Sequence, residues 1–156
     1  MIFPKDVFRL NGYNGEILAL SIREVKDCLG WDGAEDGYEL ICSLEVSAGC
    51  YHAFNKRYYT SDGALYQFKD ELKECYKNSC GTAHYKVLQD DTLCFSVQVK
   101  NGVKSLVKGI YQDLPEVGNA LHFEFETETE FFFKVIEDIE RLEGIFYGEH
   151  TKNEAV

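Results

Sequence analysis

The sequence predicts an α+β fold in which an antiparallel sheet of about seven strands packs against two helices, in the order βββαββββα. Seven segments have the apolar/polar alternation or the composition of a strand, and two carry apolar residues at helical spacing. The connections between neighbouring strand segments are short. Short connections favour antiparallel pairing, because parallel strands need long crossovers.

Three strand segments precede the first helix. Residues 16–24 and 38–46 alternate apolar and polar side chains, so each predicts a strand with one buried face. The short stretch 47–49 contains a glycine and predicts a hairpin into a third strand over 50–59, which is rich in aromatic residues.

The first helix is predicted directly after the third strand. Ser61 or Asp62 is a suitable N-cap, since either side chain can accept a hydrogen bond from an unpaired backbone N–H. An apolar stripe follows at helical spacing, formed by Leu65, Phe68, Leu72 and Cys75. Residues 78–81, ending in Gly81, predict the end of this helix.

Four further strands are predicted over residues 82–88, 92–99, 103–111 and 119–126. The dipeptide Asn101-Gly102 indicates a type I′ hairpin between the second and third of them, because both turn positions require a positive φ.

The last element is predicted to be a helix. Thr127 and Glu130 have the spacing of a capping box. A single apolar stripe follows, formed by Phe132, Val135, Ile136, Ile139 and Leu142. We expect one domain over residues 1–148, because 156 residues is the size of a single domain, and a flexible polar tail over residues 149–156.

The charge balance excludes one class of partner. The chain has 16 basic and 27 acidic residues, a formal net charge of −11, and its basic residues are scattered. Binding to nucleic acid depends on Lys and Arg that neutralise phosphates, so nucleic acid is not an expected partner. Acidic residues increase solubility and also steer association with a basic partner.

The compartment predicted from the sequence is the cytoplasm. The first residues contain neither the basic nor the apolar region of a signal peptide. No apolar run approaches the roughly 18–20 residues that a membrane helix needs, so no membrane partner is expected. The six cysteines are expected to be free thiols: Cys28, Cys42, Cys50, Cys75, Cys80 and Cys94. Cys42 lies in an alternating apolar segment and is expected to fill the core.

No catalytic, cofactor or metal motif is present. The cysteine spacings contain no C-x₂-C pair, the histidines do not have metal-ligand spacing, and the glycines form no phosphate-binding loop. We therefore expect no cofactor and no enzyme. An enzyme that uses His122 and Glu124, neighbours on one strand face, is the weakest hypothesis, since no substrate is suggested.

The most suggestive stretch for binding is the loop from Trp31 to Glu39. It combines acidic residues with two amphipathic rings, and Trp and Tyr are frequent at binding hot spots. A partly packed tryptophan flanked by solvating acids is an equally plausible interpretation. The candidate protein-binding residues are the exposed aromatic and acidic positions of this loop and of a later acidic row: Trp31, Asp32, Glu35, Asp36, Tyr38, Glu39, Glu124 and Glu126.

Four apolar patterns are spaced over most of the chain. They are Trp31-Asp32-Gly33 before a strand pair, Tyr51-x-Ala53-Phe54 before the helix with Phe68-x-x-x-Leu72, Leu93-x-Phe95-x-Val97 before the hairpin at Gly102, and Leu121-x-Phe123-x-Phe125 before the last helix. Together these patterns resemble the WapI-type immunity proteins of bacteria. That family tends to carry Asp-Gln ahead of the last helix, where this chain has Glu128-Thr129.

The resemblance implies a protein that binds and neutralises a toxin domain, usually a nuclease, and that has no catalytic residues of its own. The charge agrees, since a nuclease must be basic to hold nucleic acid and an acidic, aromatic surface can occupy its cleft. The alternative hypothesis is a small-molecule-binding module with an apolar pocket between the sheet and a helix, which a large lined cavity would favour over a filled core.

Overall fold

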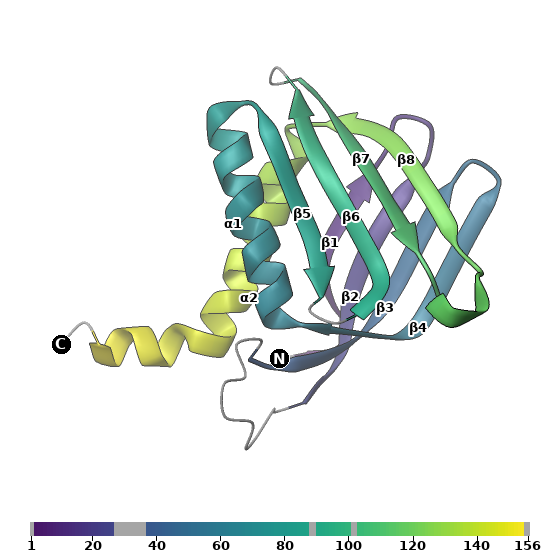
Figure 1. The fold of residues 1–156 in the computed structure, drawn as a ribbon. Coiled ribbons are helices and arrows are strands. Elements are labelled where there is room, and N and C mark those ends of the chain that lie inside the picture. The colour runs from purple at the N-terminus through teal and green to yellow at the C-terminus, as the bar shows by residue number, and fades with distance from the viewer. Residues whose placement is uncertain (1, 27–36, 88–89, 101–102, 155–156) are drawn as a thin grey trace.

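Eight strands, two α-helices and a short 3-10 helix over Pro115–Val117 make up the regular structure of the described residues (Figure 1). The computed structural model describes residues 2–26, 37–87, 90–100 and 103–154, and side chains only as far as Tyr147. Sheet A is antiparallel and contains β1 (Lys5–Asn11), β2 (Ile17–Lys26), β3 (Glu39–Ala48) and β4 (Tyr51–Ser61) in that order. Sheet B is also antiparallel and contains β5 (Gly81–Val87), β6 (Asp90–Lys100), β7 (Lys104–Tyr111) and β8 (Leu121–Glu128). The helices are α1 (Asp62–Asn78) and α2 (Phe131–Glu154).

The α+β class and the two helices agree with the prediction, whereas the number of strands and sheets differs. The strands form two sheets of four in place of one sheet of about seven, and β1 is the additional strand. Its pairing with β2 is irregular between Asp6 and Phe8, so Val7 and Phe8 are both buried. A bulge of this kind breaks the two-residue alternation by which a strand is recognised in a sequence.

The two sheets face each other across a filled core. Phe8 of β1 lies 6.0 Å from Phe95 of β6 between ring centroids, and Phe68 of α1 lies 5.2 Å from the same Phe95 ring. Tyr85 of β5 stacks on Phe95 at 4.9 Å. These rings occupy the space between the two sheets and α1.

A chain of three hydroxyl groups crosses this core between the sheets. The Tyr58 hydroxyl lies 2.8 Å from that of Tyr85, and Thr60 Oγ1 lies 2.6 Å from the Tyr85 hydroxyl. Burial raises the pKa of both tyrosines. Buried hydroxyls require partners, so this chain favours one relative placement of β4 and β5.

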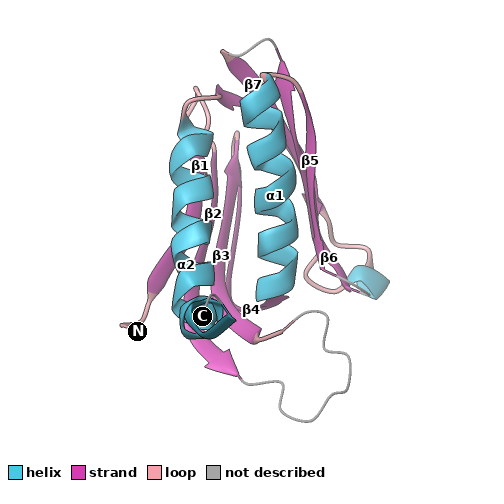
Figure 2. Ribbon diagram, turned by 90° about the vertical axis from the view of Figure 1, so that its left-hand side faces the viewer, coloured by secondary structure: helices cyan, strands magenta, loops and turns pink. Residues whose placement is uncertain are grey.

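The two helices lie side by side and antiparallel along one side of the sheets (Figure 2). Helix α1 contacts β5, the edge strand of sheet B, and α2 contacts β1, the edge strand of sheet A. Two ion pairs join the helices: Lys69–Glu143 at 3.0 Å and Lys73–Glu140 at 2.6 Å. Lys69 is buried, so its pairing with Glu143 offsets the desolvation of the charge.

The ends of α1 agree with the prediction. Ser61 is the N-cap and its side chain accepts a hydrogen bond from the backbone N–H of Ala64 at 3.2 Å. The helix ends at Asn78, and Ser79 adopts a left-handed conformation at the C-cap.

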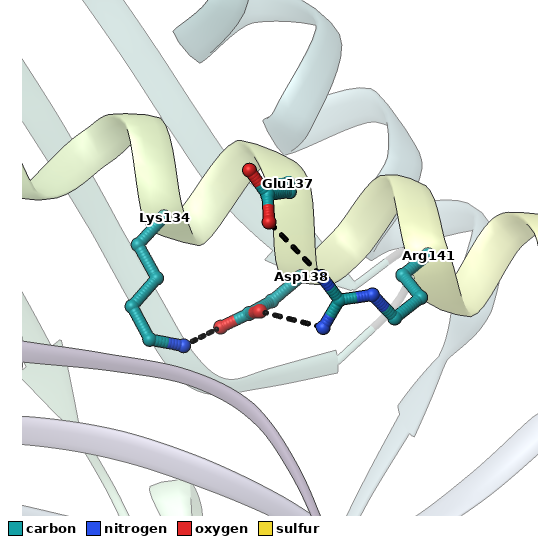
Figure 3. A network of polar contacts seen from close by, with 4 residues as sticks. All are labelled: Lys134, Glu137, Asp138 and Arg141. Atoms are coloured by element: carbon teal, nitrogen blue, oxygen red, sulfur yellow. Dashed lines mark hydrogen bonds and ion pairs between the residues drawn. The ribbon is translucent and has the colours of Figure 1, made fainter.

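The predicted capping box of the last helix is wrong. Thr127 belongs to β8, which continues to Glu128, and its hydroxyl donates to the carbonyl of Asn11 at 2.7 Å. Helix α2 begins only at Phe131. Charged side chains pair along this helix: Lys134 Nζ lies 2.6 Å from Oδ2 of Asp138, and Arg141 Nη1 lies 3.6 Å from Oδ1. Figure 3 shows the two cations approaching the Asp138 carboxylate from two sides.

The five cysteines that the structure describes are free, as the sequence predicts, and Cys28 lies outside the described residues. Cys42 is fully buried in sheet A, where burial raises the pKa of its thiol to about 12. A thiol with such a pKa stays protonated at neutral pH, so Cys42 is core filling.

Candidate functional site

The sequence-predicted binding residues lie in separate places. Four of them, Trp31, Asp32, Glu35 and Asp36, lie outside the described residues. The remaining four form two pairs near opposite ends of β3. Tyr38 and Glu39 lie at the start of that strand. Glu124 and Glu126 lie near Ala48, at the other end of the strand. An extended strand rises about 3.3 Å per residue, so the two ends of β3 are roughly 30 Å apart.

Tyr38 packs against the C-terminal helix. Its ring stacks on that of Phe146 with centroids 4.8 Å apart, and its backbone N–H donates to Oδ1 of Asp62 at 2.8 Å. The side chains of Tyr38 and Glu39 are both half-buried. Tyr38 thus holds β3 to the helices at this end of the molecule.

The second pair, Glu124 and Glu126, lines a surface hollow of about 730 Å³, which we call the acidic hollow. Its walls come from the β1–β2 turn, the β3–β4 turn and strands β7 and β8. The lining residues are Tyr13, Asn14, Glu16, Ala48, Gly49, Lys104, Leu106, Glu124, Phe125 and Glu126.

The alternation of β8 turns the acidic side chains outward. Phe123 and Phe125 are buried, whereas Glu124 and Glu126, which alternate with them along the strand, are exposed. The β1–β2 turn is fixed beside them, because the backbone N–H of Tyr13 donates to the carbonyl of Glu126 at 3.2 Å.

Gly12 allows the close approach of that turn to β8. A Cβ atom at this position would lie 2.5 Å from Oε2 of Glu16 and 2.8 Å from Cδ2 of Phe125. Non-bonded atoms do not approach a Cβ atom so closely, so any larger residue at position 12 would clash with Glu16 and Phe125. Glu16 is itself buried, and its Oε1 accepts a hydrogen bond from the backbone N–H of Asn14 at 2.8 Å. The Glu16 carboxylate therefore stabilises the turn.

One cation partly balances the carboxylates of the hollow. Lys104 Nζ lies 3.7 Å from Oε2 of Glu126 and 5.7 Å from the centre of the Tyr13 ring. Glu124 takes part in no ion pair among the residues that the structure describes. The hollow thus has three carboxylates against one ammonium group and favours a cationic partner.

One exposed aromatic ring, Tyr13, lines the acidic hollow, and a second, Tyr51, follows its lining residue Gly49 by two positions. Tyr13 is 47% exposed, and Tyr51, which pairs with Ala48 across the β3–β4 turn, is 65% exposed. Large exposed rings beside charged groups are typical of binding hot spots. Sequence reasoning missed both tyrosines. The run Asn11-Gly12-Tyr13-Asn14-Gly15, which places a ring inside a turn-rich segment, is the signal that indicates the first of them.

Metal ligands and the candidate catalytic pair are not assembled into a site in the described part of the chain. Among the ranges described, no cluster of three or more His, Cys, Asp or Glu residues could hold a metal ion. His122 and Glu124 both extend from the outer face of sheet B, but no hydrogen bond or ion pair is found between them. No helix in the described part of the chain combines the length and the apolar composition needed to span a membrane.

Comparison with known proteins yields one match. The family model described as "Immunity protein WapI-like family" matches residues 9–146. No curated protein and no solved structure matches the chain. The matched range runs from β1 to the second half of α2, so it includes both sheets, both helices and the acidic hollow.

Proposed function

The chain belongs to the WapI-like immunity protein family, and on that premise we propose that it binds a cognate protein toxin and neutralises it by blocking its active cleft. The observation that carries the proposal is the family match over both sheets and both helices. The proposed activity is binding alone, without catalysis or a cofactor, and the proposed compartment is the cytoplasm.

We assign the toxin to the nucleases on the ground of charge. A nuclease holds its substrate with Lys and Arg side chains, so its cleft is basic. The chain carries a formal net charge of −11, and Glu124 and Glu126 are exposed at the acidic hollow. Opposite potentials on the two partners steer their encounter and raise the association rate.

The acidic hollow is the proposed contact surface. Its carboxylates would pair with cationic side chains of the cleft, and the Tyr13 and Tyr51 rings would bury apolar area at its border. In interfaces of this kind the charges chiefly set the association rate, and buried aromatic anchors chiefly set the dissociation rate. The loop residues Trp31, Asp32, Glu35 and Asp36, together with Tyr38 and Glu39, remain proposed contacts for a second part of the same partner.

A toxin inhibition assay tests this proposal. The toxin domain encoded by the gene immediately upstream is assayed for nucleic-acid cleavage with increasing amounts of wild-type protein, Glu124→Lys or Glu74→Lys. Glu74 is an exposed residue of α1, so its reversal makes the same change of charge away from the acidic hollow.

The wild-type protein and Glu74→Lys are expected to inhibit equally, and Glu124→Lys to inhibit roughly tenfold or more less potently, a loss of about 1.4 kcal/mol. Full inhibition by both variants would remove the acidic hollow as the contact surface. Continued cleavage with excess wild-type protein would remove this toxin as the partner.

A further inference from the structure

A second surface feature is lined by lysine and histidine side chains in place of carboxylates. We propose that a trough on the outer face of sheet B binds an extended acidic peptide segment of a partner protein. The trough has a volume of about 560 Å³. The outward side chains that line it are His84, Lys86, Cys94, Ser96, Lys108, Ile110 and His122. This site is separate from the acidic hollow, and its assignment does not depend on the toxin.

The trough forms because the outward side chains differ in size from strand to strand. Cys94 and Ser96 on β6 are small, whereas the flanking outward residues His84 and Lys86 on β5 and Lys108 on β7 are long. Both helices pack at the sides of the sheets, so neither helix covers this face, which is turned toward the viewer in Figure 1.

Each wall of the trough carries one lysine and one histidine. His84 and Lys86 stand on β5, and Lys108 and His122 stand on β7 and β8. Lys86 has an ion pair with Asp91 at 3.6 Å, and no ion pair involves Lys108 in the described ranges. Each histidine adds an N–H donor in either protonation state. A chain with a strong net negative charge thus has a local surface suited to anions.

The register of the sheet sets the spacing of the two walls. His84 pairs with Ser96, and Ser96 pairs with Lys108, so the two walls are two strand spacings apart, roughly 10 Å. An extended peptide places alternate side chains on one face roughly 7 Å apart. Two carboxylates of such a segment can therefore reach cations on both walls, while its aliphatic atoms lie over Cys94 and Ile110.

The surroundings of the trough favour a short acidic segment over a nucleic acid. Glu124 is the register partner of Lys108 on β8, and Glu126 follows it on the same outer face. A long polyanion that crosses the trough would meet these carboxylates and the field of the whole chain, which repels it. A segment with two or three carboxylates can stay within the cationic part of the face.

The test is a two-dimensional amide NMR titration with an acetylated Glu-Ala-Glu-Ala-Glu peptide. Its glutamine counterpart and sodium acetate at equal carboxylate concentration are titrated in parallel. The expected result is saturable shifts at Cys94, Ser96 and Ile110 with the glutamate peptide alone. Equal shifts with the glutamine peptide or with acetate, or no shifts, would overturn the assignment of an acidic peptide to the trough.

Three variants locate the interaction. Lys108→Glu is expected to weaken peptide binding at least tenfold, because it reverses a charge on one wall. Ser96→Leu is expected to weaken binding equally, because the larger side chain fills the trough between its walls without a change of charge. Lys56→Glu changes an exposed residue of sheet A and is expected to bind as the wild-type protein does. Binding that Ser96→Leu and Lys108→Glu leave unchanged, with both variants folded by NMR, would contradict the location.

Discussion

The hydroxyl of Tyr147 donates a hydrogen bond to Oδ2 of Asp62 over 2.9 Å, and this contact joins the C-terminal half of α2 to the first turn of α1. The other carboxylate oxygen of Asp62 accepts from the backbone N–H of Tyr38 at the start of β3. Asp62 is fully buried, and burial raises its pKa despite the hydrogen bonds from Tyr147 and Tyr38, which lower it. One carboxylate thus connects three elements.

The raised pKa of Asp62 predicts a pH-dependent stability. The folded protein holds the Asp62 proton more tightly than the unfolded chain, whose pKa is near the ordinary value of 3.8. This contribution to stability is complete below that value and is lost as the pH rises through the higher pKa of the folded state. Asparagine at position 62 does not titrate.

The free energy of unfolding of the wild-type protein, minus that of Asp62→Asn, should therefore decrease as the pH rises from about 4 to about 7. Urea unfolding across this range measures the difference. A difference that is constant with pH, or that grows as the pH rises, would contradict the account of Asp62.

Tyr85→Phe is expected to destabilise the fold by about 1–3 kcal/mol, because it leaves the buried hydroxyls of Tyr58 and Thr60 without their shared partner. Tyr59→Phe removes an exposed hydroxyl that accepts from Arg57 and serves as the control, with little expected change. Urea unfolding compares the two variants. Equal stability of both would show that the buried chain of hydroxyls contributes nothing measurable.

Two glycine-to-alanine substitutions are expected to have opposite effects. At Gly109 a Cβ atom would lie 2.6 Å from both Phe123 Cζ and Phe95 Cβ, so Gly109→Ala should destabilise by about 1–3 kcal/mol. At Gly144 nothing lies within 4 Å, and alanine is the better helix former, so Gly144→Ala should stabilise by up to about 1 kcal/mol. Thermal unfolding measures the change in stability of both variants. An increase in the stability of Gly109→Ala would contradict the close packing of β7 against its neighbours.

Tyr13→Ala is expected to weaken toxin binding by roughly tenfold, because it removes an exposed ring at the acidic hollow. Phe133→Ala, which truncates a 58% exposed ring on α2, is the matched control and should bind as the wild-type protein does. The measurement is the toxin affinity of each variant, with the folding of each checked by circular dichroism. A greater loss for Phe133→Ala would place the contact on the helices.

The regular elements could be predicted from sequence because their signals are local. The alternation of β6 and β8, the apolar stripe of α1 and its Ser61 cap each lie within one segment. The capping-box prediction failed because of a contact between residues far apart in the sequence. The Thr127 hydroxyl donates a hydrogen bond to the backbone carbonyl of Asn11. Strand β1 was missed because its bulge interrupts the alternation.

The candidate site was less accessible to sequence reasoning, because it is assembled from distant segments. Glu124 and Glu126 were predicted as binding residues, yet nothing local indicates that the turn carrying Tyr13 packs beside them. The cationic trough was not predicted either. Its two lysines and two histidines are spread from His84 to His122 and meet only through the register of sheet B.

The central claim is tested most directly by calorimetric titration of the protein with the toxin domain encoded upstream, at about 50 mM and about 300 mM salt. We expect tight binding with one toxin per chain, weakened at the higher salt because exposed charges are then screened. Absence of a complex at both salt concentrations, with both partners folded, would contradict the claim that this chain neutralises that toxin by binding it.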